Sequence, residues 1–182
     1  MDGWQAPAGP SEPERTPLQK LASLEAIVAA TGATITEGGS EAYYRPSADQ
    51  IVMPDGWRFN RDGTRVADWY AVLFHELAHW TGHKSRLDRF TDGAVSRPEY
   101  ALEELVADLA SAFVCASTGI ASEPRPDHAR YLAGWLAAAK AEPKMLVKSA
   151  SAATKAARYI LEPESRSELS GRAPIVAAAI AA

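Results

Sequence analysis

The sequence predicts an α+β fold, in which a small antiparallel or mixed sheet toward the N-terminus is followed by several helices. Two observations indicate this fold. Short strand-like runs broken by glycine and proline occupy residues 33–53, and apolar residues recur at helical spacing on either side of them. A chain of 182 residues that is 47% hydrophobic can bury its own core, and we expect one domain over residues 17–162.

The N-terminal part divides into a leader, a helix and the strands. Residues 1–16 are rich in proline, glutamate, alanine and glycine without periodicity, and we expect a disordered leader. Leucines at helical spacing predict a helix that begins at Pro17 and stops at Gly32. Three strand-like runs follow, at residues 33–36, 41–45 and 50–53. We expect these runs to pair as a meander, with the third one offering an exposed edge to an extended peptide.

The remaining chain is predicted to be mainly helical. The expected helices lie at residues 68–82, 96–120, 127–141 and 143–161. The second of them begins with a capping box, in which Ser96 is followed three residues later by Glu99. Residues 163–182 are expected to form a C-terminal tail or a further helix.

Charge and composition exclude several classes of protein. A net charge of −4 and a pI near 5.6 do not suit a domain that binds nucleic acid on its own. The N-terminus lacks the apolar stretch of a signal peptide, and the longest apolar run, residues 173–182, is too short to cross a bilayer. The single Cys115 lies in an apolar helical pattern, which predicts a packing role in a reducing compartment. We expect a cytoplasmic protein without a membrane partner.

The segment HELAH carries the chemistry. It places His75 and His79 four residues apart, so both imidazoles project from one face of the predicted helix. Neutral imidazole is a preferred zinc ligand, and such a pair leaves room for a third residue and a water. Glu76 lies beside the first ligand, where its carboxylate could take a proton from a water that the ion makes more acidic. The motif therefore predicts one Zn²⁺, two histidine ligands and Glu76 as the catalytic base.

A third protein ligand is needed. Ser85 stands where the metzincin pattern requires a third histidine, which excludes that family. His83 would lie about 12 Å along the axis from His75 on a continuous helix. It could bind the ion only if the helix breaks at Gly82, so we expect His83 to support a ligand or to pack.

Carboxylates on the next helix are better candidates. Glu104, Asp108 and Ser111 form one narrow polar seam beside a broad apolar face. We choose Glu104 as the third ligand and Asp108, one turn later, as the acceptor for the other N–H of a ligand histidine. Glu103 lies on the same face of the predicted helix as Ala107 and Ala110, and we expect it to be solvated.

The order HExxH, then ExxxD on the next long helix, resembles the gluzincin arrangement of zinc peptidases. The segments EAYYRPSADQIVMP, FHELAHWTGHKSRL, EYALEELVADLASAFVCASTGI and HARYLAGWL resemble the zincin-like metallopeptidase domain of ArdC-type antirestriction proteins and related polyvalent proteins. The resemblance covers about residues 20–161. It implies a zincin-like fold, with Glu104 as the third zinc ligand and Asp108 as its support, and a link to antirestriction or mobile-element defence. In that family the peptidase domain usually follows a single-stranded-DNA-binding domain, and we expect this chain to begin at the junction.

We therefore expect a zinc-dependent metalloendopeptidase that cleaves a peptide or protein substrate through a metal-activated water. The alternative is a non-catalytic module that binds a host protein or, with a DNA-binding partner domain or subunit, single-stranded DNA. The basic residues Lys84, Arg86 and Arg89 after the motif are expected to form a solvated loop. Four residues are weak candidates for donors to a developing oxyanion: His128, Tyr100, Tyr131 and Tyr70.

Overall fold

The computed structural model describes residues 17–55, 66–90, 97–120 and 143–169. Its helices are α1 (Pro17–Thr31), α2 (Val66–Thr81), α3 (Arg97–Thr118), α5 (Pro143–Leu161) and α6 (Arg166–Leu169). Its strands are β1 (Thr34–Glu37), β2 (Tyr43–Arg45) and β3 (Gln50–Met53). Short 3-10 turns at Pro46–Ala48 and Pro163–Ser165 join β2 to β3 and α5 to α6. The expected leader, the capping box at Ser96 and the helix at 127–141 lie outside the described residues.

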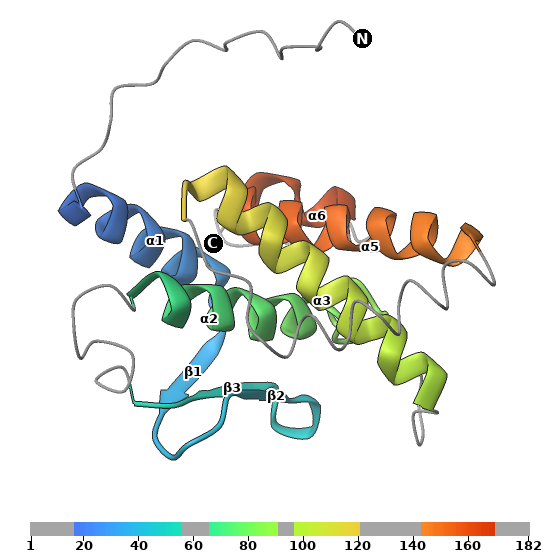
Figure 1. Ribbon diagram of the computed structural model, residues 1–182, viewed down its shortest axis with the longest axis horizontal. Coiled ribbons are helices and arrows are strands. Elements are labelled where there is room, and N and C mark those ends of the chain that lie inside the picture. The colour runs from blue at the N-terminus through green and yellow to red at the C-terminus, as the bar shows by residue number, and fades with distance from the viewer. Residues whose placement is uncertain (1–16, 56–65, 91–96, 121–142, 170–182) are drawn as a thin grey trace, which may run out of the picture.

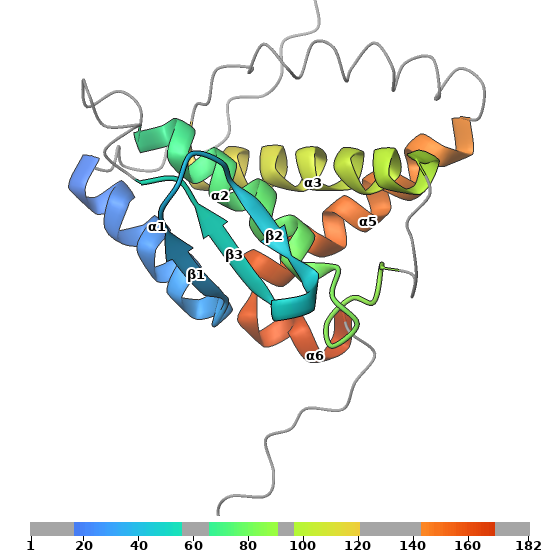
Figure 2. The same cartoon turned by 90° about the horizontal axis from the view of Figure 1, so that it is seen from below.

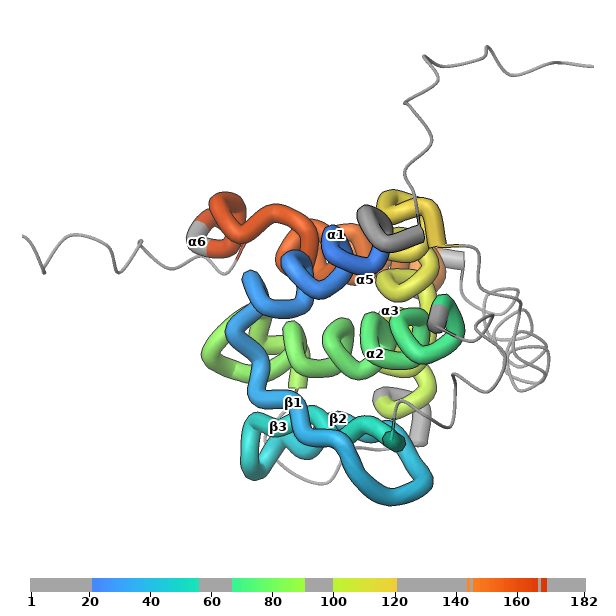
Figure 3. The backbone as a smooth tube through the Cα atoms, turned by 90° about the vertical axis from the view of Figure 1, so that its left-hand side faces the viewer, coloured from blue at the N-terminus to red at the C-terminus, as the bar shows by residue number. Residues whose placement is uncertain are grey.

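The elements form layers, with α2 in the middle (Figures 1 and 3). The sheet covers one side of α2, while α3 and α5 pack on the other side. The predicted α+β fold is confirmed. Because α2 is packed on both sides, its position in the fold is fixed, and with it the directions of its buried side chains.

The sheet is mixed and has the strand order β1-β3-β2, as Figure 2 shows. Ile51 of β3 lies opposite Ile35 of the parallel β1 and opposite Tyr44 of the antiparallel β2. The expected meander is therefore wrong, and so is the exposed edge at residues 50–53, because β3 is the central strand. The loop after β1 spans the width of one strand, because β3 lies between β1 and β2. Gly39 in this loop has a φ of 84°, a left-handed conformation that favours glycine.

Large apolar side chains fill the space between α2 and the sheet. Fully buried members of this core are Leu73, Phe74 and Leu77 of α2 with Ile51 and Met53 of β3. Burying a side chain of this size contributes roughly 1.5–3 kcal/mol. This apolar contact turns the opposite face of α2, which carries His75 and His79, away from the sheet and toward α3.

Small residues line the contact among α2, α3 and α5. The buried alanines are Ala78, Ala107, Ala110, Ala153 and Ala156. Because the distance between packed helices depends on the side chains at the contact, alanines let α3 approach α2 closely. Ser111 Oγ donates to the Ala71 carbonyl at 2.8 Å and ties the two helices together. Carboxylates near the start of α3 can therefore reach histidines on α2.

Aromatic side chains of α2 and α5 complete the core on the helical side. Tyr159 of α5 packs against Trp80 of α2, with ring centroids 6.0 Å apart. Cys115 of α3 is buried in the same core, as its predicted packing role requires. Among the helices in the described ranges, none combines the length and the apolar character that crossing a membrane requires.

Candidate metal centre

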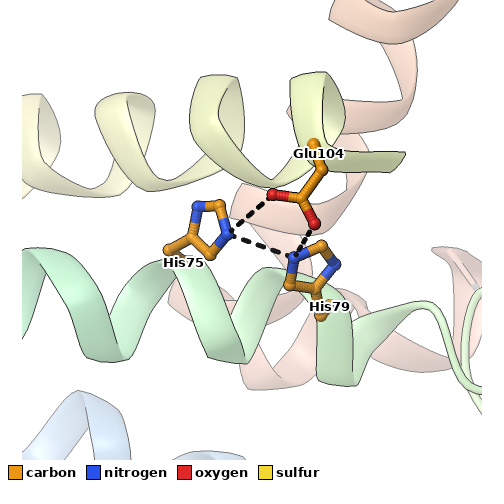
Figure 4. Close-up of side chains that lie close together, drawn as sticks. All are labelled: His75, His79 and Glu104. Carbon is orange, nitrogen blue, oxygen red and sulfur yellow. Dashed lines mark hydrogen bonds and ion pairs between the residues drawn. The ribbon is translucent and has the colours of Figure 1, made fainter. Parts of the chain in front are cut away.

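His75 and His79 of α2 and Glu104 of α3 converge on one point, as Figure 4 shows. The Nε2 atoms of the two imidazoles lie 3.1 Å apart. Glu104 Oε2 is 3.6 Å from His75 Nε2, and Glu104 Oε1 is 3.4 Å from His79 Nε2. The structure thus brings together the three residues that the sequence predicts as ligands.

The spacing of these donor atoms suits a divalent metal ion. Donors at the corners of a tetrahedron, each roughly 2.0–2.2 Å from a zinc ion, lie about 3.3–3.6 Å from one another. Here the two Nε2 atoms lie 3.1 Å apart, the two oxygens of Glu104 lie 3.4 and 3.6 Å from one imidazole each, and one donor atom from each of the three residues lies within 4.8 Å of the others. Two imidazoles and one carboxylate also form a ligand set that leaves a fourth position for water. In the part of the chain that the structure describes, no other group of three or more histidine, cysteine or acidic residues brings its ligand atoms within 4.8 Å of one another.

The outer nitrogen of each imidazole faces a carboxylate. His75 Nδ1 lies 2.7 Å from Asp108 Oδ1. His79 Nδ1 lies 3.3 Å from Glu103 Oε1. A carboxylate at Nδ1 favours the tautomer that leaves Nε2 free for a metal, and it fixes the orientation of the ring. Asp108 occupies the place expected for it, whereas the contact of Glu103 was not expected.

Glu103 is not solvated, contrary to the expectation from the sequence. Its side chain is 15% exposed, and Arg89 donates to both of its oxygens at 2.7 and 3.0 Å. The physical reason is the line of alanines on the same face of α3. Ala107 and Ala110 are buried at the helix contact, so this face turns inward. Small residues below a carboxylate were the signal that could have shown its burial.

Glu76 lies on the flank of the cluster and is 7% exposed. The backbone N–H of Tyr44, on β2, donates to its carboxylate. Burial raises the pKa of Glu76, although the neighbouring His75 and His79 and this hydrogen bond oppose the rise. A carboxylate with a raised pKa is better matched to proton transfer near neutral pH.

The histidines are strongly coupled to the acidic groups around them. Burial lowers the pKa of both imidazoles, but the facing carboxylates outweigh it. The pKa of His75 rises, and that of His79 rises to about 9. Burial alone would raise the pKa of Glu104, yet its contacts with the two histidines hold that pKa well below its usual value. A cation bound here would displace the protons that the histidines retain.

The weaker candidates from the sequence have other surroundings. His83 follows the end of α2, and its Nδ1 contacts Ser85 Oγ at 2.7 Å. Tyr70 donates to Glu25 of α1, and Tyr100 is 59% exposed on α3. The other two, His128 and Tyr131, lie outside the described residues. The structure therefore does not bring His83 or Tyr70 to the cluster.

Arg86 is buried and Arg89 is partly buried, so the expected solvated loop is wrong for both arginines. Arg86 is 7% exposed, stacks on the Trp80 ring at 3.9 Å from its centroid, and donates to Asp49 at 2.9 Å. The Arg89 side chain is 12% exposed. Of the three basic residues in this segment, only Lys84 is exposed. Cations already paired within the chain contribute little to phosphate binding, which weighs against a nucleic-acid site here.

Sequence comparisons find relatives that match most of the chain. A family model described as a zincin-like metallopeptidase matches residues 22–152. The uncharacterized protein y4eC of Sinorhizobium fredii is 39% identical over 176 residues, which cover 95% of this chain and 55% of that protein. DNA primase TraC of Escherichia coli is 41% identical over 143 residues, which cover 78% of this chain and 10% of that protein. The chain thus spans about half of y4eC and a small part of TraC.

Solved structures show the same relationship. The Mn(II)-bound crystal structure of the antirestriction protein ArdC from plasmid R388 matches with a TM-score of 0.70 and 41% identity. The match covers 78% of this chain and 52% of that one. The metal-free structure of ArdC matches with a TM-score of 0.66 at the same identity, covering 78% of this chain and 50% of that one. These matches confirm the resemblance inferred from the sequence motifs.

Proposed function

Because the chain belongs to the zincin-like metallopeptidase family, we propose that it is an endopeptidase that depends on one bound zinc ion. The observation that carries the proposal is the convergence of His75, His79 and Glu104, with the buried Glu76 at their side. The relative ArdC is described as Mn(II)-bound, which supports a divalent ion at the corresponding place in this chain.

Each residue of the cluster has a separate task in this proposal. His75, His79 and Glu104 would hold the ion, and Asp108 keeps the His75 ring in place. When bound, the ion supplies Lewis-acid chemistry, which makes water more acidic and polarises a carbonyl. Glu76 takes the proton of the attacking water and delivers it to the leaving amine. The raised pKa of Glu76 suits a group that must both accept and release a proton.

Strand β2 is the proposed place for the substrate backbone. It lies at an edge of the sheet, it contacts α2, and its Tyr44 N–H reaches Glu76. An extended peptide can add to such an edge through main-chain hydrogen bonds. A peptide on β2 would then pass beside the base, so β2 replaces residues 50–53 as the proposed substrate edge.

The substitution Glu76→Gln tests the activity. It keeps the size of the side chain but removes the base, so hydrolysis should fall by about 100-fold or more while the ion stays bound. Cleavage of an unfolded protein substrate and metal content are measured on the same samples. Glu162→Gln is the control, because Glu162 is an exposed glutamate paired with Arg158 on α5. Undiminished cleavage by the Glu76→Gln variant would refute the assignment of the base.

The similarity to ArdC supports a second proposal, a cytoplasmic role in antirestriction. Such protection could come from cleavage, or from contact with a host protein without cleavage. The Glu76→Gln variant separates the two, with survival of unmodified DNA in a restricting host as the measurement. Protection lost together with cleavage supports the peptidase, and protection that survives the loss of cleavage supports an interaction module.

A further inference from the structure

Arg89 links the end of α2 to the beginning of α3. Its Nη2 donates to the Ala78 carbonyl at 2.7 Å, and its Nη1 donates to Thr81 Oγ1 at 2.8 Å. The same guanidinium holds Glu103 through Nε at 3.0 Å and Nη2 at 2.7 Å. A planar guanidinium engaged on three sides has little freedom to move, so it defines the position of the carboxylate that it holds.

The carboxylate held by Arg89 is the one that faces His79. Glu103 Oε1 accepts from Arg89 Nη2 and lies 3.3 Å from His79 Nδ1. The three groups form a chain, from Arg89 through Glu103 to His79, and all three side chains are largely buried. The pairing with Arg89 also balances the charge of Glu103. Glu103 is thus engaged by Arg89, and the adjacent Glu104 is the carboxylate available to bind an ion.

Gly82 provides the space for this arrangement. A Cβ at this position would lie 2.9 Å from Phe90 Cζ, 3.0 Å from Arg89 Nη2 and 3.0 Å from the His79 carbonyl oxygen. A side chain at position 82 would force the Phe90 ring to shift and would crowd the guanidinium of Arg89 and the His79 carbonyl. This chain shares Gly82 with the metzincin pattern but has Ser85 in place of its third histidine. Gly82 here leaves room for Arg89 at the end of α2.

We propose that Glu103 and Arg89 are positioning residues for His79. Glu103 fixes the ring so that Nε2 points to the other two ligands, and Arg89 fixes Glu103. The inference rests on the proposed metal site and extends it to the segment that follows α2. In this proposal neither residue would bind the ion, and both would act through His79.

Ion affinity of the full chain, stripped of metal with a chelator, tests this inference. Zn²⁺ binding is measured by competition with a chromogenic chelator. Glu103→Ala should weaken binding by about 10- to 100-fold, the usual effect of losing a carboxylate behind a ligand histidine. Arg89→Met should weaken binding in the wild-type background, and by no more than about twofold when Glu103 is already alanine. Glu162→Ala and Arg158→Met, which alter an exposed ion pair at the end of α5, are the matched controls and should bind as wild type.

A second readout separates positioning from a general loss of stability. In the stripped protein, measured at a pH above the His79 pKa of about 9 so that the ring is neutral, the ¹⁵N shifts of the His79 ring should move toward a mixture of tautomers in Glu103→Ala, while those of His83 stay unchanged. A variant with lower stability but wild-type affinity and an unchanged His79 ring would overturn the proposal. If the wild type itself binds no ion, the proposed metal site fails first, before any variant is compared.

Discussion

Glu76 and Glu104 are glutamates beside the same two histidines, yet their pKa values shift in opposite directions. Burial dominates at Glu76 and raises its pKa. At Glu104 the contacts with both imidazoles outweigh burial and lower the pKa. Two neighbouring carboxylates with opposite shifts suit different tasks, one as a proton carrier and the other as a permanently charged ligand.

The raised pKa of His79 predicts how ion affinity depends on pH. Its ring titrates at about 9 in the absence of an ion, compared with an ordinary value of 6.5. Because the ring must lose its proton to bind a cation, affinity should increase from pH 6.5 to pH 9. The increase should reach about tenfold per pH unit where one proton is released. Chelator competition at several pH values measures it, and an affinity that stays flat over this range would contradict the shift.

The same shifts predict the stability of the protein after its metal has been removed. The raised histidine pKa values stabilise the fold below pH 6.5, and this contribution is lost as the pH rises through about 9. The lowered pKa values of Glu103 and Glu104 stabilise the fold above pH 4.5, and that contribution is lost at lower pH. The Tm of the stripped protein should therefore fall between pH 6.5 and pH 9. With Zn²⁺ present the fall should be smaller, because the ion replaces the protons.

At the scale of elements, Arg86 joins the end of α2 to the turn between β2 and β3. Its Nε donates to the Trp80 carbonyl at 2.6 Å, and its guanidinium pairs with Asp49. Asp49 has a φ of 48° and accepts from the Tyr44 hydroxyl at 2.8 Å. The proposed substrate edge, β2, is thus fastened to the helix that carries the histidines.

The substitution Arg86→Met tests this connection. It removes the hydrogen bonds and the stacking on Trp80, and it should lower the free energy of unfolding by roughly 1–3 kcal/mol. Because β2 would then be held less firmly beside Glu76, KM for peptide substrates should rise while Zn²⁺ affinity stays close to that of the wild type. Urea unfolding and steady-state kinetics measure the two effects. A variant with wild-type stability and KM would contradict the role of this network.

The parts of the fold that local patterns determine were predicted well. Helix α5 covers the predicted residues 143–161, and α1 begins at Pro17 and ends just before Gly32 as expected. The order of the strands was missed, because pairing depends on contacts between distant residues and not on alternation within a strand.

The candidate site also divides into residues that local spacing predicts and contacts that depend on the tertiary fold. Helical spacing was enough to choose His75, His79 and Glu104, which the structure brings together. The link from Arg89 to Glu103 depends on how the chain turns after Gly82, and no periodicity in the sequence reports that turn. The burial of Glu103 follows from helix packing, which also lies beyond a local pattern.

At the scale of the whole molecule, the cluster lies where the two helices that carry the ligands meet in the layered fold. An ion bound there would add a further link between α2 and α3, which already pack against each other. Binding of an ion only to the folded state should therefore stabilise the fold as a whole. The chain spans about half the length of the relatives y4eC and ArdC.

Metal content of the purified full chain tests the central claim most directly. Elemental analysis after dialysis should find one zinc ion per wild-type chain, and about the same amount in the Glu162→Gln control. His79→Ala and Glu104→Ala should each lose the ion, because each removes one of three protein ligands. Stoichiometric metal in either ligand variant, or wild type that binds no ion when Zn²⁺ is supplied, would contradict the account.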